Sequence, residues 1–145
     1  RIANAIGANC TYKRNCIVLD FGTATTFDVI TKDVYKGGVI APGVYLSLST
    51  LIKSADQIPP FTLKKINNVI GNNTISALRS GFYWGYSGLI ENILLLIKKK
   101  TKKNYKVILT GGYSSLFQKS IKSRVFIDKD ITMKGLIQII KSERI

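Results

Sequence analysis

The chain has 145 residues, of which 46% are hydrophobic and 21% are charged, so its composition excludes a disordered chain and indicates one globular domain with a core. It carries 22 Lys and Arg against 8 Asp and Glu, and the net charge of +14 suits nucleic acid, a membrane surface or anionic small molecules as partners. The sequence contains no histidine, which excludes a histidine general base or metal ligand and a Ser-His-Asp triad within the chain.

The basic residues gather at expected helix ends and in the loops beyond them, at 98–103, 119–124 and 141. Lysines at these places meet the helix dipole favourably, so the pattern favours a solvated surface over a nucleic-acid-binding face. The most apolar run, 81–97, contains polar residues and makes a poor bilayer span, so we expect neither nucleic acid nor a membrane as partner. Cys10 and Cys16 form no disulfide or zinc pattern, and we expect a cytoplasmic protein without a signal peptide.

Apolar periodicity and turn signals predict helices and strands in a definite order along the chain. The expected strands are 16–20, 25–31, 35–40, 106–110 and 125–127. The expected helices are 1–8, 44–54, 74–100, 114–120 and 132–141, with caps at Asn73 or Thr74 and at Thr132, and with a loop over 55–71. The first three strands have the spacing of an antiparallel meander that turns at 32–34. This order predicts an α/β fold, one ribonuclease-H-like half of an actin-like ATPase, in which 1–145 is a single domain.

The first candidate site follows the first strand, in the run Asp20-Phe21-Gly22-Thr23-Ala24-Thr25-Thr26. Gly22 lets a ligand approach the backbone, and the threonines can offer hydroxyls to phosphate oxygens. Asp20 can hold a cation or order a water. The run is typical of a nucleotide-phosphate turn, and it also occurs in ordinary hairpin turns, where Asp caps the turn and Gly supplies a positive φ.

Two further glycine motifs flank expected strands. Thr110-Gly111-Gly112 joins a strand to a helix and is either an anion-binding helix start or a plain turn. The segment 37–43, Gly-Gly-Val-Ile-Ala-Pro-Gly, predicts a close approach of the backbone, which either lines a pocket or packs tightly on a neighbour.

The long helix carries small residues at helical spacing, namely Ala77, Gly81, Gly85 and Gly88. Each interior glycine costs about 1 kcal/mol relative to alanine, so we expect a closely packed partner, either within the chain or from a second subunit. The nearby aromatic residues at 83, 84 and 86 are typical of interfaces. The expected apolar stripe of this helix consists of Ile75, Leu78, Phe82, Tyr86, Leu89, Ile93 and Leu96.

With these pieces in order, the chain resembles the type III pantothenate kinases of the sugar-kinase, actin and heat-shock-chaperone superfamily. The motifs that carry the resemblance are Arg1-Ile2-Ala3-Asn4, 20–26, 37–43, Asn73-Thr74 with Ser80-Gly81, 110–112, and Lys134-Gly135-Leu136. The resemblance implies transfer of the γ-phosphate of ATP onto pantothenate, the first step toward coenzyme A.

The resemblance also implies roles for individual residues. Arg1 would hold the pantothenate carboxylate, which a guanidinium binds through two N–H groups. Thr74 would reach the substrate across a homodimer interface. Thr23, with Gly22 and Gly111, would contact the ATP phosphates, and Asp20 would help to bind a monovalent cation, K⁺ or NH₄⁺.

The chain departs from the family pattern in three respects. The family has Gly-Ala-Asp-Arg here, so the catalytic aspartate would immediately precede Arg1, and Asn72 stands where a basic residue is common. The family's first domain, with its Mg²⁺ site, would also lie outside the chain. We therefore expect the C-terminal domain of a two-domain kinase, inactive alone and poorly soluble as a monomer. The alternatives are a transcription accessory factor that binds nucleic acid, or another small-molecule kinase or phosphatase of the superfamily.

Overall fold

The computed structural model describes residues 1–55 and 58–143, so positions 56–57 of the expected loop lie outside the described residues. The helices are α1 Ile2–Tyr12, α2 Val44–Ser54, α3 Thr74–Thr101, α4 Ser114–Phe117 and α5 Ile131–Ser142. The strands are β1 Cys16–Phe21, β2 Ala24–Thr31, β3 Val34–Pro42, β4 Lys106–Gly111 and β5 Val125–Ile127. The predicted order of elements is confirmed.

The strands form one mixed sheet in the order β3-β2-β1-β4-β5. β1 pairs antiparallel with β2, and β2 with β3, so the expected meander is confirmed. β4 lies parallel to β1 on the other side, and β5 parallel to β4. The turn between β2 and β3 is tighter than expected, because Lys32 and Asp33 take positive φ values of 48° and 65°, as a two-residue hairpin turn requires.

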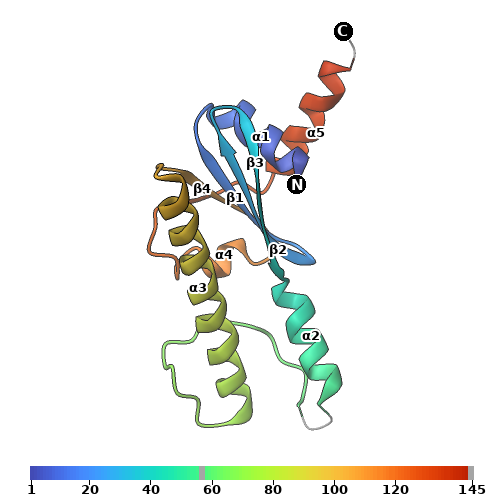
Figure 1. Cartoon of the computed structure of the whole chain (residues 1–145). Coiled ribbons are helices and arrows are strands. Elements are labelled where there is room, and N and C mark those ends of the chain that lie inside the picture. The colour runs from blue at the N-terminus through green and yellow to red at the C-terminus, as the bar shows by residue number, and fades with distance from the viewer. Residues whose placement is uncertain (56–57, 144–145) are drawn as a thin grey trace.

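Helices cover both faces of this sheet (Figure 1). Ile17 and Leu19 of β1 face the larger core, which α3 and α4 complete. Cys16 and Val18 face a smaller core that also contains Ile131 and two alanines of α1. Burial on both faces explains why β1 reads as an uninterrupted apolar run rather than an alternating one.

α1 and α5 lie side by side, in contact through their backbones (Figure 1). A Cβ on Gly7 would lie 2.1 Å from the carbonyl oxygen of Ile131, and one on Gly135 would lie 1.8 Å from that of Ala3. Three helices differ from expectation, and one of them is α4, which ends at Phe117 rather than at 120. α1 continues four residues beyond 8 to Tyr12, and α5 begins after Asp130 rather than at a Thr132 cap.

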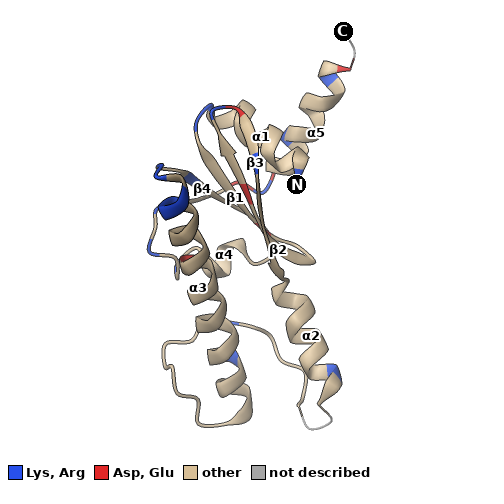
Figure 2. Cartoon of the chain, in the orientation of Figure 1, with Lys and Arg blue, Asp and Glu red and all other residues tan. Residues whose placement is uncertain are grey.

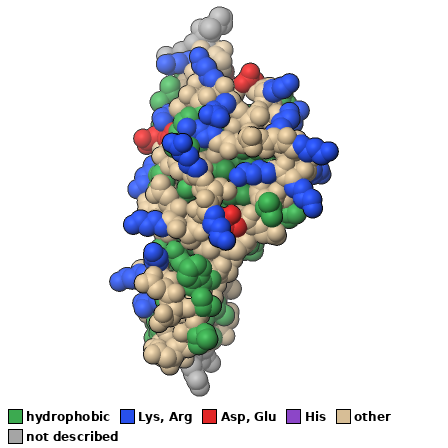
Figure 3. All heavy atoms as spheres, turned by 90° about the vertical axis from the view of Figure 1, so that its left-hand side faces the viewer, with side chains coloured by type: hydrophobic (Ala, Val, Ile, Leu, Met, Phe, Trp, Pro, Cys, Tyr) green, Lys and Arg blue, Asp and Glu red, His purple; other side chains and the backbone are tan. Residues whose placement is uncertain are grey.

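α2 and the N-terminal half of α3 extend away from the sheet as an arm (Figure 1). Lys and Arg residues, blue in Figure 2, lie mainly around the sheet and at the C-terminal end of α3, and few of them lie on the arm. Apolar side chains gather on the arm in the side view (Figure 3). No helix within the described ranges is long and apolar enough to cross a bilayer.

The most buried face of α3 is rotated from the predicted apolar stripe, although Phe82, Tyr86, Leu89 and Ile93 of that stripe pack, partly buried, against the larger core. Its buried residues are Ser80, Tyr83, Ser87, Ile90 and Leu94, whereas the expected stripe is half-buried or exposed. In the part of the chain that the structure describes, a Cβ on any of the three glycines at 81, 85 and 88 would meet nothing within 4 Å. Of the two expected kinds of partner, a helix packed on these glycines within the described chain is therefore excluded, and a second subunit stays a prediction.

Candidate active site

The turn between β1 and β2 lies at the molecular surface. Gly22 and Thr23 are both exposed, so the proposed phosphate-binding positions are open to a ligand. The N–H of Gly22 donates to the carbonyl oxygen of Ala24 at 3.1 Å and thereby closes the turn. The Gly22 amide is therefore already used within the turn, and Thr23 is the exposed residue of the turn that has a hydroxyl side chain to offer.

The structure brings the two predicted phosphate turns together at one groove. Phe21 pairs with Gly111 across β1 and β4, and the N–H of Gly112 donates to the Phe21 carbonyl oxygen at 3.1 Å. A groove of about 450 Å³ opens beside them. Its lining consists of Phe21, Gly22, Thr23, Tyr45, Leu46, Gly112 and Tyr113.

Two glycines bring the walls of this groove close to each other. Gly111 has φ +84°, and a Cβ on it would lie 2.5 Å from the Phe21 carbonyl oxygen. A Cβ on Gly43, which precedes α2, would lie 1.9 Å from the carbonyl oxygen of Thr23. β4 and α2 can therefore meet the turn only because both positions lack a side chain.

Asp20 lies on the opposite face of the sheet, toward α1. Its Oδ2 accepts a hydrogen bond from Nδ2 of the buried Asn4 at 2.9 Å, and Asn4 in turn accepts one from the Thr132 hydroxyl. Thr26 and Thr110 are its register partners in β2 and β4. No group of three or more Asp, Glu or Cys side chains suited to a metal occurs within residues 1–55 and 58–143.

Arg1 is held by a buried carboxylate. Its Nε donates to Oδ1 of Asp28 at 2.7 Å, and the Tyr35 hydroxyl donates to the same oxygen at 2.9 Å. The hydrogen bond to Asp28 raises the pKa of Arg1 above its ordinary value. Burial and then the bond to Asp28 raise the pKa of Tyr35.

Three residues of this candidate site were not predicted from the sequence: Asn4, Asp28 and Tyr35. For two of them, the sequence contains a feature that could have indicated a role. Asp28 is a charged residue among the apolar residues Phe27, Val29 and Ile30 of β2. Asn4 follows Arg1 by three positions, which places both on one side of a helix.

Within one chain, Thr74 lies far from the other predicted site residues. It is the exposed first residue of α3, at the end of the arm far from α1 (Figure 1). Asn73 caps the helix: its side chain accepts from the Ser76 N–H at 2.9 Å, which confirms one of the two expected caps.

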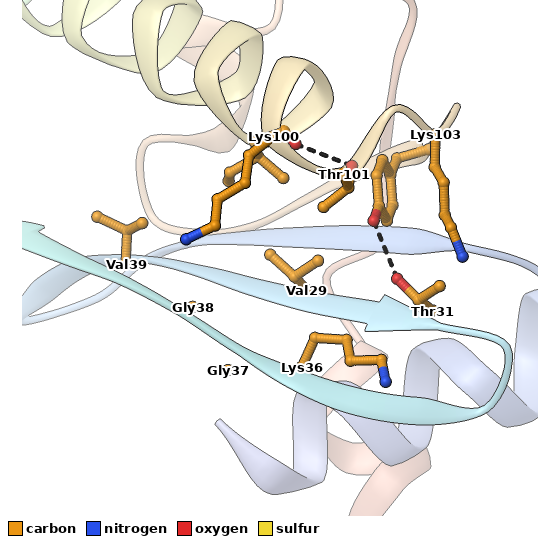
Figure 4. Close-up of a pocket in the computed structure, with 11 residues that line it drawn as sticks. Val29, Thr31, Lys36, Gly37, Gly38, Val39, Lys100, Thr101 and Lys103 are labelled. Atoms are coloured by element: carbon orange, nitrogen blue, oxygen red, sulfur yellow. Dashed lines mark hydrogen bonds between the residues drawn. The ribbon is translucent and has the colours of Figure 1, made fainter.

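A second cavity, of about 480 Å³, lies at the opposite end of the sheet and contains none of the predicted site residues (Figure 4). Gly37 and Gly38 line it, and a Cβ on Gly38 would lie 1.9 Å from the Phe27 carbonyl oxygen. The motif therefore both lines a pocket and packs tightly.

The comparisons identify the relatives of this chain. A family profile for type III pantothenate kinase matches residues 1–95. The chain belongs to the type III pantothenate kinase family. It is 63% identical over 138 residues to the type III pantothenate kinase of Pelagibacter ubique, an alignment that covers 95% of this chain and 55% of the relative. The corresponding enzyme of Jannaschia sp. is 47% identical over 142 residues, covering 97% and 55%. The chain thus spans about half the length of these curated relatives.

Solved structures show the fold of this kinase-family chain. It resembles a conserved candidate Baf family transcriptional activator from Campylobacter jejuni with a TM-score of 0.71 at 23% identity, over 98% of this chain and 64% of that one. The activator of 2-hydroxyisocaproyl-CoA dehydratase from Clostridium difficile, solved with ADPNP, gives 0.54 at 11% identity, over 99% and 68%. These likenesses confirm the predicted α/β fold of an actin-like ATPase half.

Proposed function

We propose that the protein containing this chain transfers the γ-phosphate of ATP to pantothenate. The observation that carries the proposal is the meeting of the turns at Thr23 and Gly112 beside one open groove, in a chain of this kinase family. The chain spans about 55% of this relative's length, and the proposal therefore assigns the activity to a longer protein in which residues 1–145 form the C-terminal domain. The cytoplasmic location expected from the sequence stays a prediction.

Phosphoryl transfer depends on positioning and on neutralising charge in the transition state. In this proposal Thr23 contacts the ATP phosphates, and Gly22 and Gly111 shape the turns around them. Arg1 binds the pantothenate carboxylate. Asp20 offers a single carboxylate with hydroxyl neighbours, which matches one positive charge, so K⁺ or NH₄⁺ is the proposed ion. Residues outside this chain would supply the general base and most Mg²⁺ ligands.

We further propose a homodimer formed through the arm. An apolar groove of about 420 Å³ runs between α2 and α3, and Ala77, Gly81 and Gly85 lie on its α3 side. Since nothing in the described chain covers these glycines, a second subunit is the partner that would offset their cost to the helix. The exposed Thr74 at the same end of α3 would then approach the partner's site.

The test is release of ADP that depends on both ATP and pantothenate, measured on the full-length protein with K⁺ or with Na⁺. We expect Thr23→Val to lower kcat/KM strongly, since it removes the hydroxyl at the groove. The matched control is Thr50→Val, because Thr50 is an exposed threonine on α2 outside the groove lining. Residues 1–145 alone should give no turnover. ADP release that ignores pantothenate would contradict the proposal and point to another small-molecule kinase.

Nucleic-acid binding is the second candidate function. The surface that would carry it is the basic end of α3, with Lys98, Lys99 and Lys100 in its last turn (Figure 2). A transcription accessory role requires DNA affinity that falls steeply with salt concentration. Titration of labelled duplex DNA at two salt concentrations separates this candidate from the kinase, which needs no such affinity.

A further inference from the structure

Asp28 is a carboxylate in the centre of the sheet, where charged groups are rare. It lies on β2, and its side chain is 0% exposed. Its Oδ1 accepts hydrogen bonds from Arg1 Nε and from the Tyr35 hydroxyl. Its Oδ2 is also buried and has no hydrogen-bond partner among the described residues.

This arrangement is poorly suited to stability alone. A buried carboxylate loses its hydration, and an oxygen without a donor leaves that loss uncompensated. Replacement of a buried ion pair by apolar side chains is often neutral or stabilising. Neither the resemblance to the kinase family nor the described fold assigns Asp28 a role. The ion pair therefore calls for an explanation through what it does to Arg1.

The contact fixes the orientation of the Arg1 guanidinium. The Arg1 Nε–H group donates its hydrogen bond to Asp28, and within the described residues the Arg1 side chain makes no other hydrogen bond. The backbone of β3 passes close to the guanidinium at Gly38, where a Cβ would lie 2.7 Å from Nη2. The Arg1 side chain is 36% exposed, so the group is anchored on one side and open on the other.

We propose that Asp28, assisted by Tyr35, is a positioning residue that holds Arg1 so that its terminal N–H groups face the substrate carboxylate. The inference rests on the proposed function, in which Arg1 binds pantothenate. An arginine that is already oriented loses less conformational freedom when it binds a carboxylate through two N–H groups. Asp28 itself does not touch the substrate and is not a catalytic residue.

The test compares two ligands that differ in one group, pantothenate and its neutral alcohol pantothenol. Their dissociation constants are measured by calorimetry on the full-length protein. Asp28→Ala should weaken pantothenate binding roughly 10- to 100-fold, the range typical of lost orientation, and leave pantothenol binding unchanged. Asp28→Asn keeps an oxygen acceptor for Nε and should retain part of the preference for pantothenate.

Asp128→Ala is a matched control. Asp128 also pairs with one cation, Lys134 at 2.7 Å, and with one tyrosine hydroxyl, that of Tyr12 at 2.9 Å. This variant should lose stability without changing the ratio of the two dissociation constants. Tyr35→Phe removes one hydrogen bond to Asp28 at an exposed position, and this variant keeps the test valid if Asp28→Ala does not fold.

An unchanged ratio of dissociation constants in Asp28→Asn and Tyr35→Phe, or tighter binding of pantothenate by Asp28→Ala, would overturn the inference. A separate readout distinguishes this from failure of the proposed function. The Arg1 Nε–H signal of the ligand-free protein, followed by ¹⁵N NMR, should exchange slowly in the wild type and rapidly in Asp28→Ala. If the wild type shows slow exchange but no preference for pantothenate over pantothenol, the proposed function is contradicted, while the anchoring of Arg1 by Asp28 still holds. Rapid exchange in the wild type would overturn the anchoring itself.

Discussion

Asn4 Nδ2 donates to Asp20 Oδ2 at 2.9 Å and so ties α1 to the end of β1, beside the candidate phosphate turn. The same Asn4 side chain accepts a hydrogen bond from Thr132 at the start of α5. One buried amide thus links three elements from the two ends of the chain. It leaves Oδ1 of Asp20 on the side of Gly22, since a Cβ on that glycine would lie 3.8 Å from this oxygen.

Asn4→Ala should lower the free energy of unfolding by about 1–3 kcal/mol, because it leaves the Thr132 hydroxyl and one Asp20 oxygen without a partner. Urea denaturation measures the loss. Thr132→Val is the graded control, since it removes one of the two hydrogen bonds and keeps the Asn4–Asp20 contact. Equal stability of the wild type and Asn4→Ala would show that the link is not structural.

Asp128 should make the stability depend on pH in the acid range. Burial raises the pKa of its carboxyl, but hydrogen bonds from Lys134 and Tyr12 and the Lys134 charge outweigh this and hold the pKa below the ordinary 3.8. A carboxyl with a lowered folded pKa stabilises the protein above its unfolded pKa, and this contribution disappears as the pH falls through the folded pKa.

The measurement is urea denaturation at a series of pH values from about 6 down to about 3. The difference in unfolding free energy between the wild type and Asp128→Asn should shrink as the pH falls. A difference that stays constant over the range would mean that the Lys134 pair contributes nothing that depends on the charge of Asp128.

Gly111, the last residue of β4, and Gly112, which follows it, should respond differently to the same substitution. Gly111→Ala places a Cβ 2.5 Å from the Phe21 carbonyl oxygen at φ +84°, and should cost about 1–3 kcal/mol of stability. At Gly112 a Cβ meets nothing within 4 Å in the described chain, so Gly112→Ala should change stability by less than about 0.5 kcal/mol. Thermal unfolding of both variants checks this, and similar losses would contradict the close contact of β1 and β4.

Glycines on the open face of α3 provide a test of association. Gly88→Ala should stabilise the helix by about 1 kcal/mol, because the new methyl group meets nothing in the described chain. Gly85→Ala should give the same gain to a monomer, yet Gly85 lines the groove between α2 and α3. Sedimentation equilibrium should therefore show weaker dimerisation for Gly85→Ala alone. Identical association of both variants would place the dimer contact elsewhere.

The strands could be predicted from the sequence to within two residues, because β1 and β4 are short apolar runs that end at glycine-containing turns. The face of α3 that is most buried could not be predicted in this way. Its buried side includes Ser80 and Ser87, whose hydroxyls bond to the backbone carbonyls of Val69 and Tyr83. Serines satisfied in this way are tolerated in a core, so an apolar count points to the neighbouring stripe instead.

In the candidate site, too, some features could be predicted from the sequence and others could not. Motifs predicted that Thr23 and Gly111 belong to phosphate-type turns, and their closeness follows from pairing of β1 with β4. The contacts of Asp28 with Arg1 and Tyr35 depend on the register of β2 against β3 and on the docking of α1, which no local pattern reports. Roles of individual residues in binding remain predictions.

The packing of α1 against α5 has a consequence for synthesis on the ribosome. α1 is synthesised well before α5, so the surface around Gly7 stays without its neighbour until α5 has been translated. The smaller core, with Ala5, Val18 and Ile131, therefore cannot close before α5 has left the ribosome. Since Thr132 completes the contacts of Asn4, the surroundings of Asp20 are also complete only once α5 is present.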